Sequence, residues 1–120
     1  MDNDTTIEEL KNKVKKFCEE RDWDQYHNAK DLAIGIITES SELLEHFRFK
    51  SEKEIEGYFE IPEKKKEISE ELSDILYFVL RLSQKYNIDL TTELSKKIQK
   101  NKEKYPVEKS RGSNKKYDEI

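Results

Sequence analysis

Turn-forming residues are scarce in this chain, which has three glycines and two prolines among 120 residues. Sandwiches and barrels need a turn after each short strand, so the chain has too few turn residues for an all-β fold. Its apolar residues instead recur at spacings of three and four, as on one face of an α-helix. The sequence therefore predicts an all-α fold.

Four amphipathic helices are predicted, over residues of about 6–21, 29–49, 62–86 and 89–104. Thr6 and Glu9 have the spacing of a capping box, Pro62 suits the first turn of the third helix, and Asp89 can cap the fourth. Such helices are expected to pack as a four-helix bundle. We expect a single domain over residues 1–106 and a polar C-terminal tail, without helical periodicity, over residues 107–120.

Composition and charge narrow the function classes. Charged residues make up 42% of the chain and hydrophobic residues 33%, so a monomer would have a thin core, and we expect a homodimer or homotetramer. The net charge is −4 with both signs interspersed, which disfavours nucleic-acid binding. The chain shows no membrane-length apolar stretch and no signal-peptide pattern, and its single cysteine, Cys18, cannot form an internal disulfide. We expect a cytoplasmic protein without a membrane partner.

Two of the predicted helices carry the pattern Glu-x-x-acid, with Glu39 and Glu42 in one and Glu71 and Asp74 in the other. The spacing alone is weak evidence, because 27 acids among 120 residues give about six such pairs by chance, which is what the sequence shows. The position on the helix says more. In each helix the first acid borders the apolar stripe and the second lies ~60° farther out, on the same rotational side. If the two helices pack together, four carboxylates would converge at the rim of the core.

Four converging carboxylates repel one another, and no Lys or Arg stands at these helix edges to neutralise them. Such a cluster needs a cation. Hard oxygen ligands without Cys or His spacing match Mg²⁺ or Mn²⁺, and a carboxylate-held metal with open coordination positions typically serves phosphate groups. The alternative is that the acids are only the solvated flank of two helices.

Four motifs follow one another along the chain: RDWDQYH, ESSELLEHF, EELSDILYFV and KKIQKNKEKYP. Together they resemble the MazG-like nucleotide pyrophosphohydrolases, in particular the small all-α branch that includes the dCTP pyrophosphatases. The resemblance covers residues of about 21–106, with a further likeness at KYDEI. It implies that a nucleoside triphosphate is hydrolysed to a monophosphate and pyrophosphate, as expected of an enzyme that clears unwanted nucleotides. The implied Mg²⁺ ligands and catalytic residues, with Mn²⁺ as a substitute metal, are Glu39, Glu42, Glu71 and Asp74.

The resemblance also implies a substrate pocket. Trp23 and His27 match positions that help to enclose the nucleoside, and Asn101 and Tyr105 match positions near the metals, sugar or nucleotide. Phe49 and Phe78 replace a frequent tryptophan and tyrosine, which keeps a flat surface but removes a hydrogen-bond donor. Lys50 follows Phe49 and matches the lysine of a Trp-Lys pair that is frequent in the family. The remaining candidates are cations that would neutralise substrate phosphates, namely Lys97, Lys104, Arg111, Lys115 and Lys116.

Several of these residues also have ordinary structural explanations. Trp23 is equally explained as a core residue, His27 as a helix cap and Asn101 as an exposed helical position. For the whole protein, two further functions stay open: a non-catalytic helical module that binds a nucleotide or a protein, and a phosphoribosyl-ATP pyrophosphatase. The aromatic set around Trp23, Phe49 and Phe78 fits a base-stacking pocket better than the latter. The sequence leaves open the base, the sugar, the number of metals and the general base.

Overall fold

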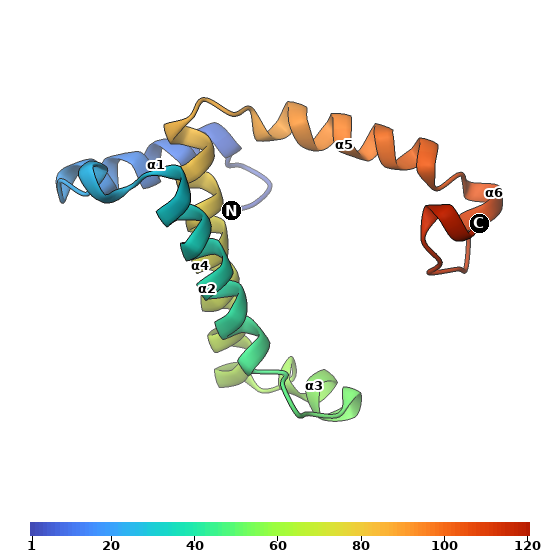
Figure 1. The fold of residues 1–120 in the computed structure, drawn as a ribbon. Helices are drawn as coiled ribbons and strands as arrows, with labels where there is room; N and C mark the ends of the chain where they lie inside the picture. Colours follow the sequence, from blue (N-terminus) through green and yellow to red (C-terminus); the bar gives the residue numbers. More distant parts are fainter. The chain divides into compact units, whose positions relative to one another are not determined.

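The structure is a computed structural model that describes residues 1–120, and it is helical throughout, without β-strands (Figure 1). The predicted all-α fold is confirmed. Two short 3₁₀ helices, η1 (Asp24–Tyr26) and η2 (Tyr117–Glu119), accompany six α-helices. These are α1 (Ile7–Glu20), α2 (Ala29–Glu45), α3 (Glu52–Tyr58), α4 (Pro62–Lys85), α5 (Leu90–Lys104) and α6 (Val107–Ser110).

The predicted helix starts agree closely with the structure because local capping chemistry sets them. The Thr6 hydroxyl accepts a hydrogen bond from the Glu9 N–H before α1, and the Asp89 carboxylate accepts one from the Thr92 N–H before α5. Pro62 is the first residue of α4. The N-cap of α2 is Asn28, so His27 does not have the capping role considered for it.

The second helix is shorter than predicted. It ends at Glu45, and residues 46–49 form a turn that ends at Phe49, whose φ of 63° lies in the left-handed region. Phe47 extended the apolar periodicity past the true end. Its ring instead stacks on Phe59, with the ring centroids 6.4 Å apart, at the end of α3. The segment between the second and third predicted helices, where no helix was predicted, contains all of α3, which begins where the Ser51 hydroxyl accepts a hydrogen bond from the Glu54 N–H.

The chain packs as two compact units, residues 1–87 and residues 88–120. In the first unit, α2 and α4 lie side by side along most of their length, and α1 packs against α4 (Figure 1). The second unit holds α5, α6 and η2, so the predicted tail contains short ordered helices. There, the Lys104 ammonium lies 4.8 Å from the centre of the Tyr117 ring, and the Tyr105 ring contacts the same tyrosine at 6.3 Å. The predicted domain boundary after residue 106 stays a prediction.

The core of the first unit is small. Its fully buried apolar side chains are Cys18, Leu32, Ile68 and Leu80. Many apolar side chains of α2 and α4 are exposed, because two paired helices cover only one face of each other. Ile37 of α2 is 70% exposed, and Leu72 of α4 is 53% exposed. None of the helices is both long and apolar enough to cross a membrane.

Candidate metal centre

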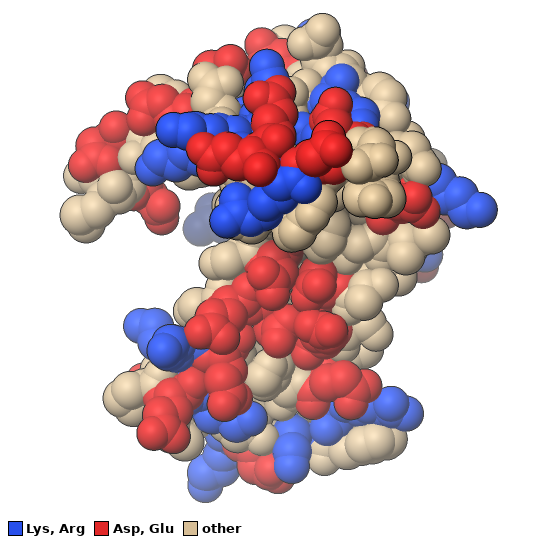
Figure 2. Space-filling model, turned by 90° about the vertical axis from the view of Figure 1, so that its left-hand side faces the viewer, with Lys and Arg blue, Asp and Glu red and all other residues tan.

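Three acidic side chains converge where α2 lies against α4. Glu39 and Glu42 stand one turn apart on α2, Glu71 faces them from α4, and one carboxylate oxygen of each lies within 4.8 Å of the others. Glu39 and Glu71 are half-buried, whereas Glu42 is exposed. Figure 2 shows acidic side chains gathered on one face of the molecule. The structure thus brings together three of the four predicted ligands.

Asp74, the fourth predicted ligand, is exposed one turn farther along α4 and is not part of this close group. The negative charge of Asp74 nevertheless acts on Glu39. Burial first, then hydrogen bonding with Glu42 and the negative charges of Glu42, Asp74 and Glu71, raise the pKa of Glu39 to about 7. The role of all four residues as metal ligands stays a prediction.

Glu71 has a similar environment. Burial and its interaction with Glu42 raise its pKa, while His46 opposes the shift. One oxygen of Glu39 and one of Glu71 are buried without any hydrogen-bond partner. A buried carboxylate oxygen without a partner is costly, and a hard divalent cation would satisfy both. The donor set, made of carboxylate oxygens from two rigid helices, therefore fits a metal such as Mg²⁺ or Mn²⁺.

His46 is a neighbour of this cluster that the sequence analysis did not consider. Its Nε2 lies 3.7 Å from a Glu71 oxygen and its Nδ1 lies 3.9 Å from a Glu67 oxygen. The spacing contained the signal, because His46 follows Glu39 by seven residues and Glu42 by four, which places all three on one edge of a helix.

A row of aromatic rings connects the loop after α1 with α2. Phe17 lies between Trp23 and Tyr77, with ring centroids 5.5 Å and 6.1 Å apart, and Tyr77 contacts Phe78 at 5.1 Å. All three pairs are edge-to-face, a favourable geometry for aromatic rings. We call Phe17, Trp23, Tyr77 and Phe78 the aromatic row; it joins two predicted substrate residues, Trp23 and Phe78.

The aromatic row ends at Gly35, beneath the ring of Phe78. A Cβ at Gly35 would lie 2.6 Å from that ring, so only glycine leaves room for the phenyl group against the α2 backbone. Gly35 precedes Glu39 by one helical turn. The close approach of α2 and α4 at this glycine therefore lies next to the carboxylate cluster.

The other predicted substrate residues of the first unit lie in loops. His27 follows η1, with its ring 6.3 Å from that of Trp23. Phe49 and Lys50 follow α2. The Phe49 side chain is 90% exposed in a left-handed conformation that is strained for a bulky residue, and the Arg48 guanidinium lies 4.6 Å from the centre of its ring.

The remaining candidates belong to residues 88–120. Lys97 and Asn101 are exposed on α5, and Arg111 is exposed after α6. Lys104 and Tyr105 both contact the ring of Tyr117, as described above. Lys115 and Lys116 are exposed before η2. The substrate roles of these residues stay predictions.

The all-α fold and the cluster of carboxylates between two neighbouring helices define a helical protein with a candidate metal centre. Comparison with known proteins identifies the family. The model of the MazG-like family matches residues 34–120, so the chain belongs to the MazG-like family. The predicted family resemblance is confirmed.

Individual relatives agree with this assignment. The chain is 34% identical to dCTP pyrophosphatase 1 of Rattus norvegicus over 115 residues, which cover 96% of this chain and 68% of that protein. It is 31% identical to dCTP pyrophosphatase 1 of Homo sapiens, with the same coverage. The crystal structure of a pyrophosphatase from Archaeoglobus fulgidus matches with a TM-score of 0.77 and 36% identity, covering 83% of this chain and 92% of that one. These comparisons support the prediction that the chain is a nucleotide pyrophosphohydrolase.

Proposed function

We propose that this protein is a Mg²⁺-dependent pyrophosphohydrolase that converts a nucleoside or deoxynucleoside triphosphate and water into the monophosphate and pyrophosphate. The observation that carries the proposal is the convergence of Glu39, Glu42 and Glu71, with two buried oxygens that lack hydrogen-bond partners. Membership of the MazG-like family and the pyrophosphatase names of the relatives support the same activity. The product pattern suits an enzyme that clears unwanted or non-standard nucleotides.

The charges of substrate and site explain why a divalent metal is part of the proposal. A triphosphate brings about four negative charges to a cluster of carboxylates that already repel one another. A divalent metal held by these carboxylates would offset the charges and would supply a lowered pKa to the attacking water. The carboxylates of Glu39, Glu42, Glu71 and Asp74 would hold the metal, and Mn²⁺ could substitute for Mg²⁺.

The proposed reaction balances as a hydrolysis. A water oxygen bonds to phosphorus, one site carboxylate accepts the water proton, and the bond between the α-phosphorus and the bridging oxygen breaks. Pyrophosphate leaves with the electron pair of that bond. The two rigid helices hold the acids in place before the substrate arrives, which favours an ordered reaction geometry.

The test is a panel of triphosphates assayed with Mg²⁺. We expect release of pyrophosphate rather than orthophosphate, and dCTP is assayed first because the mammalian relatives are named for it. Reaction in ¹⁸O-labelled water then shows which phosphorus is attacked, because the label enters the monophosphate for attack at the α-phosphorus and pyrophosphate for attack at the β-phosphorus. Orthophosphate as the product, or no turnover of any triphosphate, would contradict the proposal.

The same panel distinguishes the alternatives. Phosphoribosyl-ATP is included, and its exclusive turnover would identify a phosphoribosyl-ATP pyrophosphatase. Binding of a nucleotide without turnover would identify a non-catalytic module. The aromatic row, which lies beside Gly35 and the carboxylate cluster, favours a pocket that stacks a nucleobase over a phosphoribosyl-ATP pyrophosphatase.

We also propose a second copy of this chain as the partner of the exposed apolar face of α2 and α4. Its members recur at helical spacing and are Ile34, Ile37 and Leu44 on α2 and Leu72 and Leu76 on α4. Exposed apolar side chains at helical spacing, on a chain with a small core, are typical of an interaction site. Pairing of identical faces about a twofold axis would cover it in both copies, giving a dimer or a tetramer built from dimers.

A further inference from the structure

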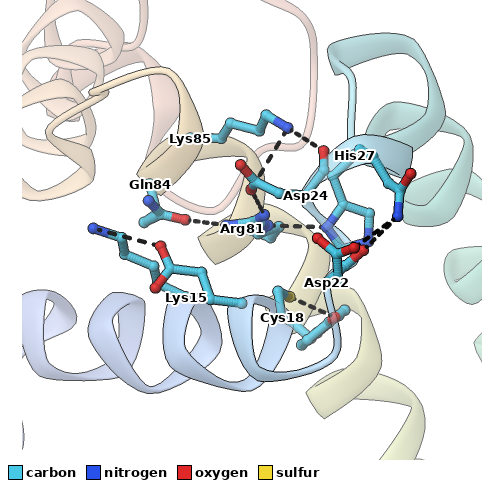
Figure 3. A network of polar contacts seen from close by, with 11 residues as sticks. Lys15, Cys18, Asp22, Asp24, His27, Arg81, Gln84 and Lys85 are labelled. Atoms are coloured by element: carbon cyan, nitrogen blue, oxygen red, sulfur yellow. Dashed lines mark hydrogen bonds and ion pairs between the residues drawn. The ribbon is translucent and has the colours of Figure 1, made fainter.

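A buried arginine joins α4 to the loop between α1 and α2 (Figure 3). The Arg81 side chain is 1% exposed. Its Nε donates to His27 Nδ1 at 2.9 Å, its Nη2 donates to the Asp24 carboxylate, and its Nη1 donates to the Gln84 side-chain oxygen. Burying a guanidinium is costly unless such partners satisfy it, so the arrangement requires an explanation beyond packing.

We propose that Arg81 is a positioning residue for His27, holding the imidazole in one orientation as the Nε2-protonated tautomer, so that it presents a fixed N–H donor beside Trp23. This inference rests on the proposed function and on the role that the family resemblance implies for Trp23 and His27, which is to help enclose the nucleoside. It adds a residue for which neither the sequence motifs nor the family resemblance gave a role.

The chemistry of the hydrogen bond fixes the tautomer. A guanidinium only donates and is always charged at physiological pH, so the His27 Nδ1 facing it must accept. The ring hydrogen then resides on Nε2. A flexible imidazole would have to select this orientation and tautomer on binding, and prior ordering removes that cost.

The neighbouring charges keep His27 neutral. Burial lowers its pKa first, followed by the positive charges of Arg81 and Lys85, while Asp24 opposes them. These groups, on α4 and η1, are the charged neighbours that act on the imidazole. A neutral ring with one N–H serves as a donor of defined direction, whereas a protonated ring would lose the Arg81 contact.

Arg81 and the neighbouring Lys85 together fix the backbone segment that carries His27. Lys85, one turn after Arg81, donates from Nζ to the Asp24 carbonyl oxygen at 2.8 Å and lies 3.7 Å from the Asp24 carboxylate. Both bonds attach η1 to α4, and Trp23 and His27 flank η1 directly. The loop is therefore attached through one short helix and one imidazole, and Arg81 contacts both.

The first experiment is NMR spectroscopy of the ¹⁵N-labelled protein without nucleotide. In the wild type we expect the His27 Nδ1 shift of an unprotonated acceptor and a protonated Nε2. In Arg81→Met, which retains the length of the side chain but not its donors, we expect a mixture of tautomers and a higher His27 pKa. A wild-type His27 protonated on Nδ1 would overturn the proposal.

The second experiment measures kinetics with the triphosphate that the panel selects. Arg81→Met should raise KM by at least about tenfold, the size expected for loss of a charge-assisted hydrogen bond, with a smaller change in kcat. In a His27→Ala background the same substitution should add little to the loss. An undiminished additional loss in that background would show that Arg81 does not act through His27.

Lys85→Met is the matched control, because it removes a cation from the same turn of α4 but leaves the Arg81–His27 bond in place. It should leave the His27 tautomer unchanged. Circular dichroism melting of each variant separates unfolding from loss of positioning. If no triphosphate is turned over, the proposed function fails, and the tautomer measured in the wild-type protein still decides the role of Arg81.

Discussion

Glu39, Glu42 and Glu71 are held closer together than their charges favour in the absence of a cation. Burial first, and then the interactions with the neighbouring acids, raise the pKa of Glu39. Apolar contacts hold α2 and α4 against each other, and the two helices thereby keep the three carboxylates close together. A cation would convert this unfavourable arrangement into a stable one.

Removing one charge from this cluster, or the charge of Asp74, which also acts on Glu39, should therefore separate activity from stability. We expect Glu42→Gln or Asp74→Asn to abolish pyrophosphate release, because a metal ligand is lost. The melting temperature of the metal-free protein should stay equal or rise, because repulsion is relieved. The measurements are a pyrophosphate-release assay and thermal melting in EDTA.

Glu45→Gln is the matched control. Glu45 lies on the same helix, three residues after Glu42, but its carboxylate pairs with Arg48 at 3.3 Å. Its substitution should leave turnover near the wild-type value. A clear loss of stability in metal-free Glu42→Gln would instead indicate that this acid has a structural role.

At the scale of elements, the contact between α2 and α4 depends on the absence of a side chain at Gly35. Gly35→Ala places a methyl group against the Phe78 ring and should destabilise the fold by roughly 1–3 kcal/mol, as overpacking of a tight contact does. Urea unfolding measures this change.

Gly57→Ala is the control for Gly35→Ala. Gly57 also lies in a helix, α3, but a Cβ there would meet nothing within 4 Å. It should be neutral or stabilising by up to ~1 kcal/mol, since alanine is the better helix former. Equal effects at the two glycines would show that the Phe78 contact is not tight.

The junction between η1 and α4 should weaken in acid. The pKa values of His27 and Asp24 are both lowered in the folded protein, for His27 chiefly by burial and for Asp24 chiefly by the Arg81 hydrogen bond. The folded state therefore binds these protons less tightly than the unfolded state, so stability falls as pH falls. The His27 contribution is complete above its ordinary value of 6.5 and is lost below it, whereas the Asp24 contribution is lost only below 3.8.

The measurement is the free energy of unfolding of the wild type and of His27→Gln between pH 7.5 and 5. Glu39, whose pKa is raised to about 7, also titrates in this window, so the difference between the two proteins isolates His27. We expect the gap to shrink as the pH falls. A gap that stays constant or widens would contradict a lowered His27 pKa.

Helix starts could be predicted from the sequence because a cap is local: Thr6, Pro62 and Asp89 each act within one turn. The end of α2 could not, because Phe47 satisfies the helical period while its ring serves a contact with α3. The edge placement of the acids correctly anticipated the convergence of Glu39, Glu42 and Glu71. Arg81 could not be recognised, because its partners His27 and Asp24 are more than fifty residues away in the sequence.

At the scale of the whole molecule, the small core of the first unit leaves apolar side chains on α2 and α4 exposed. Glu39 and Glu71 lie on the same helices as this apolar face. An assembly that covers the face would therefore also hold the two helices that carry the acids. The expected dimer or tetramer is for this reason relevant to catalysis as well as to stability.

Disrupting the face should give monomers. We expect the double variant Ile37→Glu, Leu72→Glu to sediment as a monomer in analytical ultracentrifugation, because two charges would be buried at the interface of each subunit. Val107→Glu is the control, since Val107 is similarly exposed but lies outside the face. A wild-type protein that is already monomeric at micromolar concentration would refute the proposed partner.

The chain has one tryptophan, and that residue, Trp23, lies in the loop fixed by Arg81. Its intrinsic fluorescence thus arises from a single known position. Nucleotide titrations followed by emission intensity and acrylamide quenching can therefore monitor this loop without an attached dye. The unmodified protein therefore contains its own reporter for testing the predicted enclosure of the substrate by this loop.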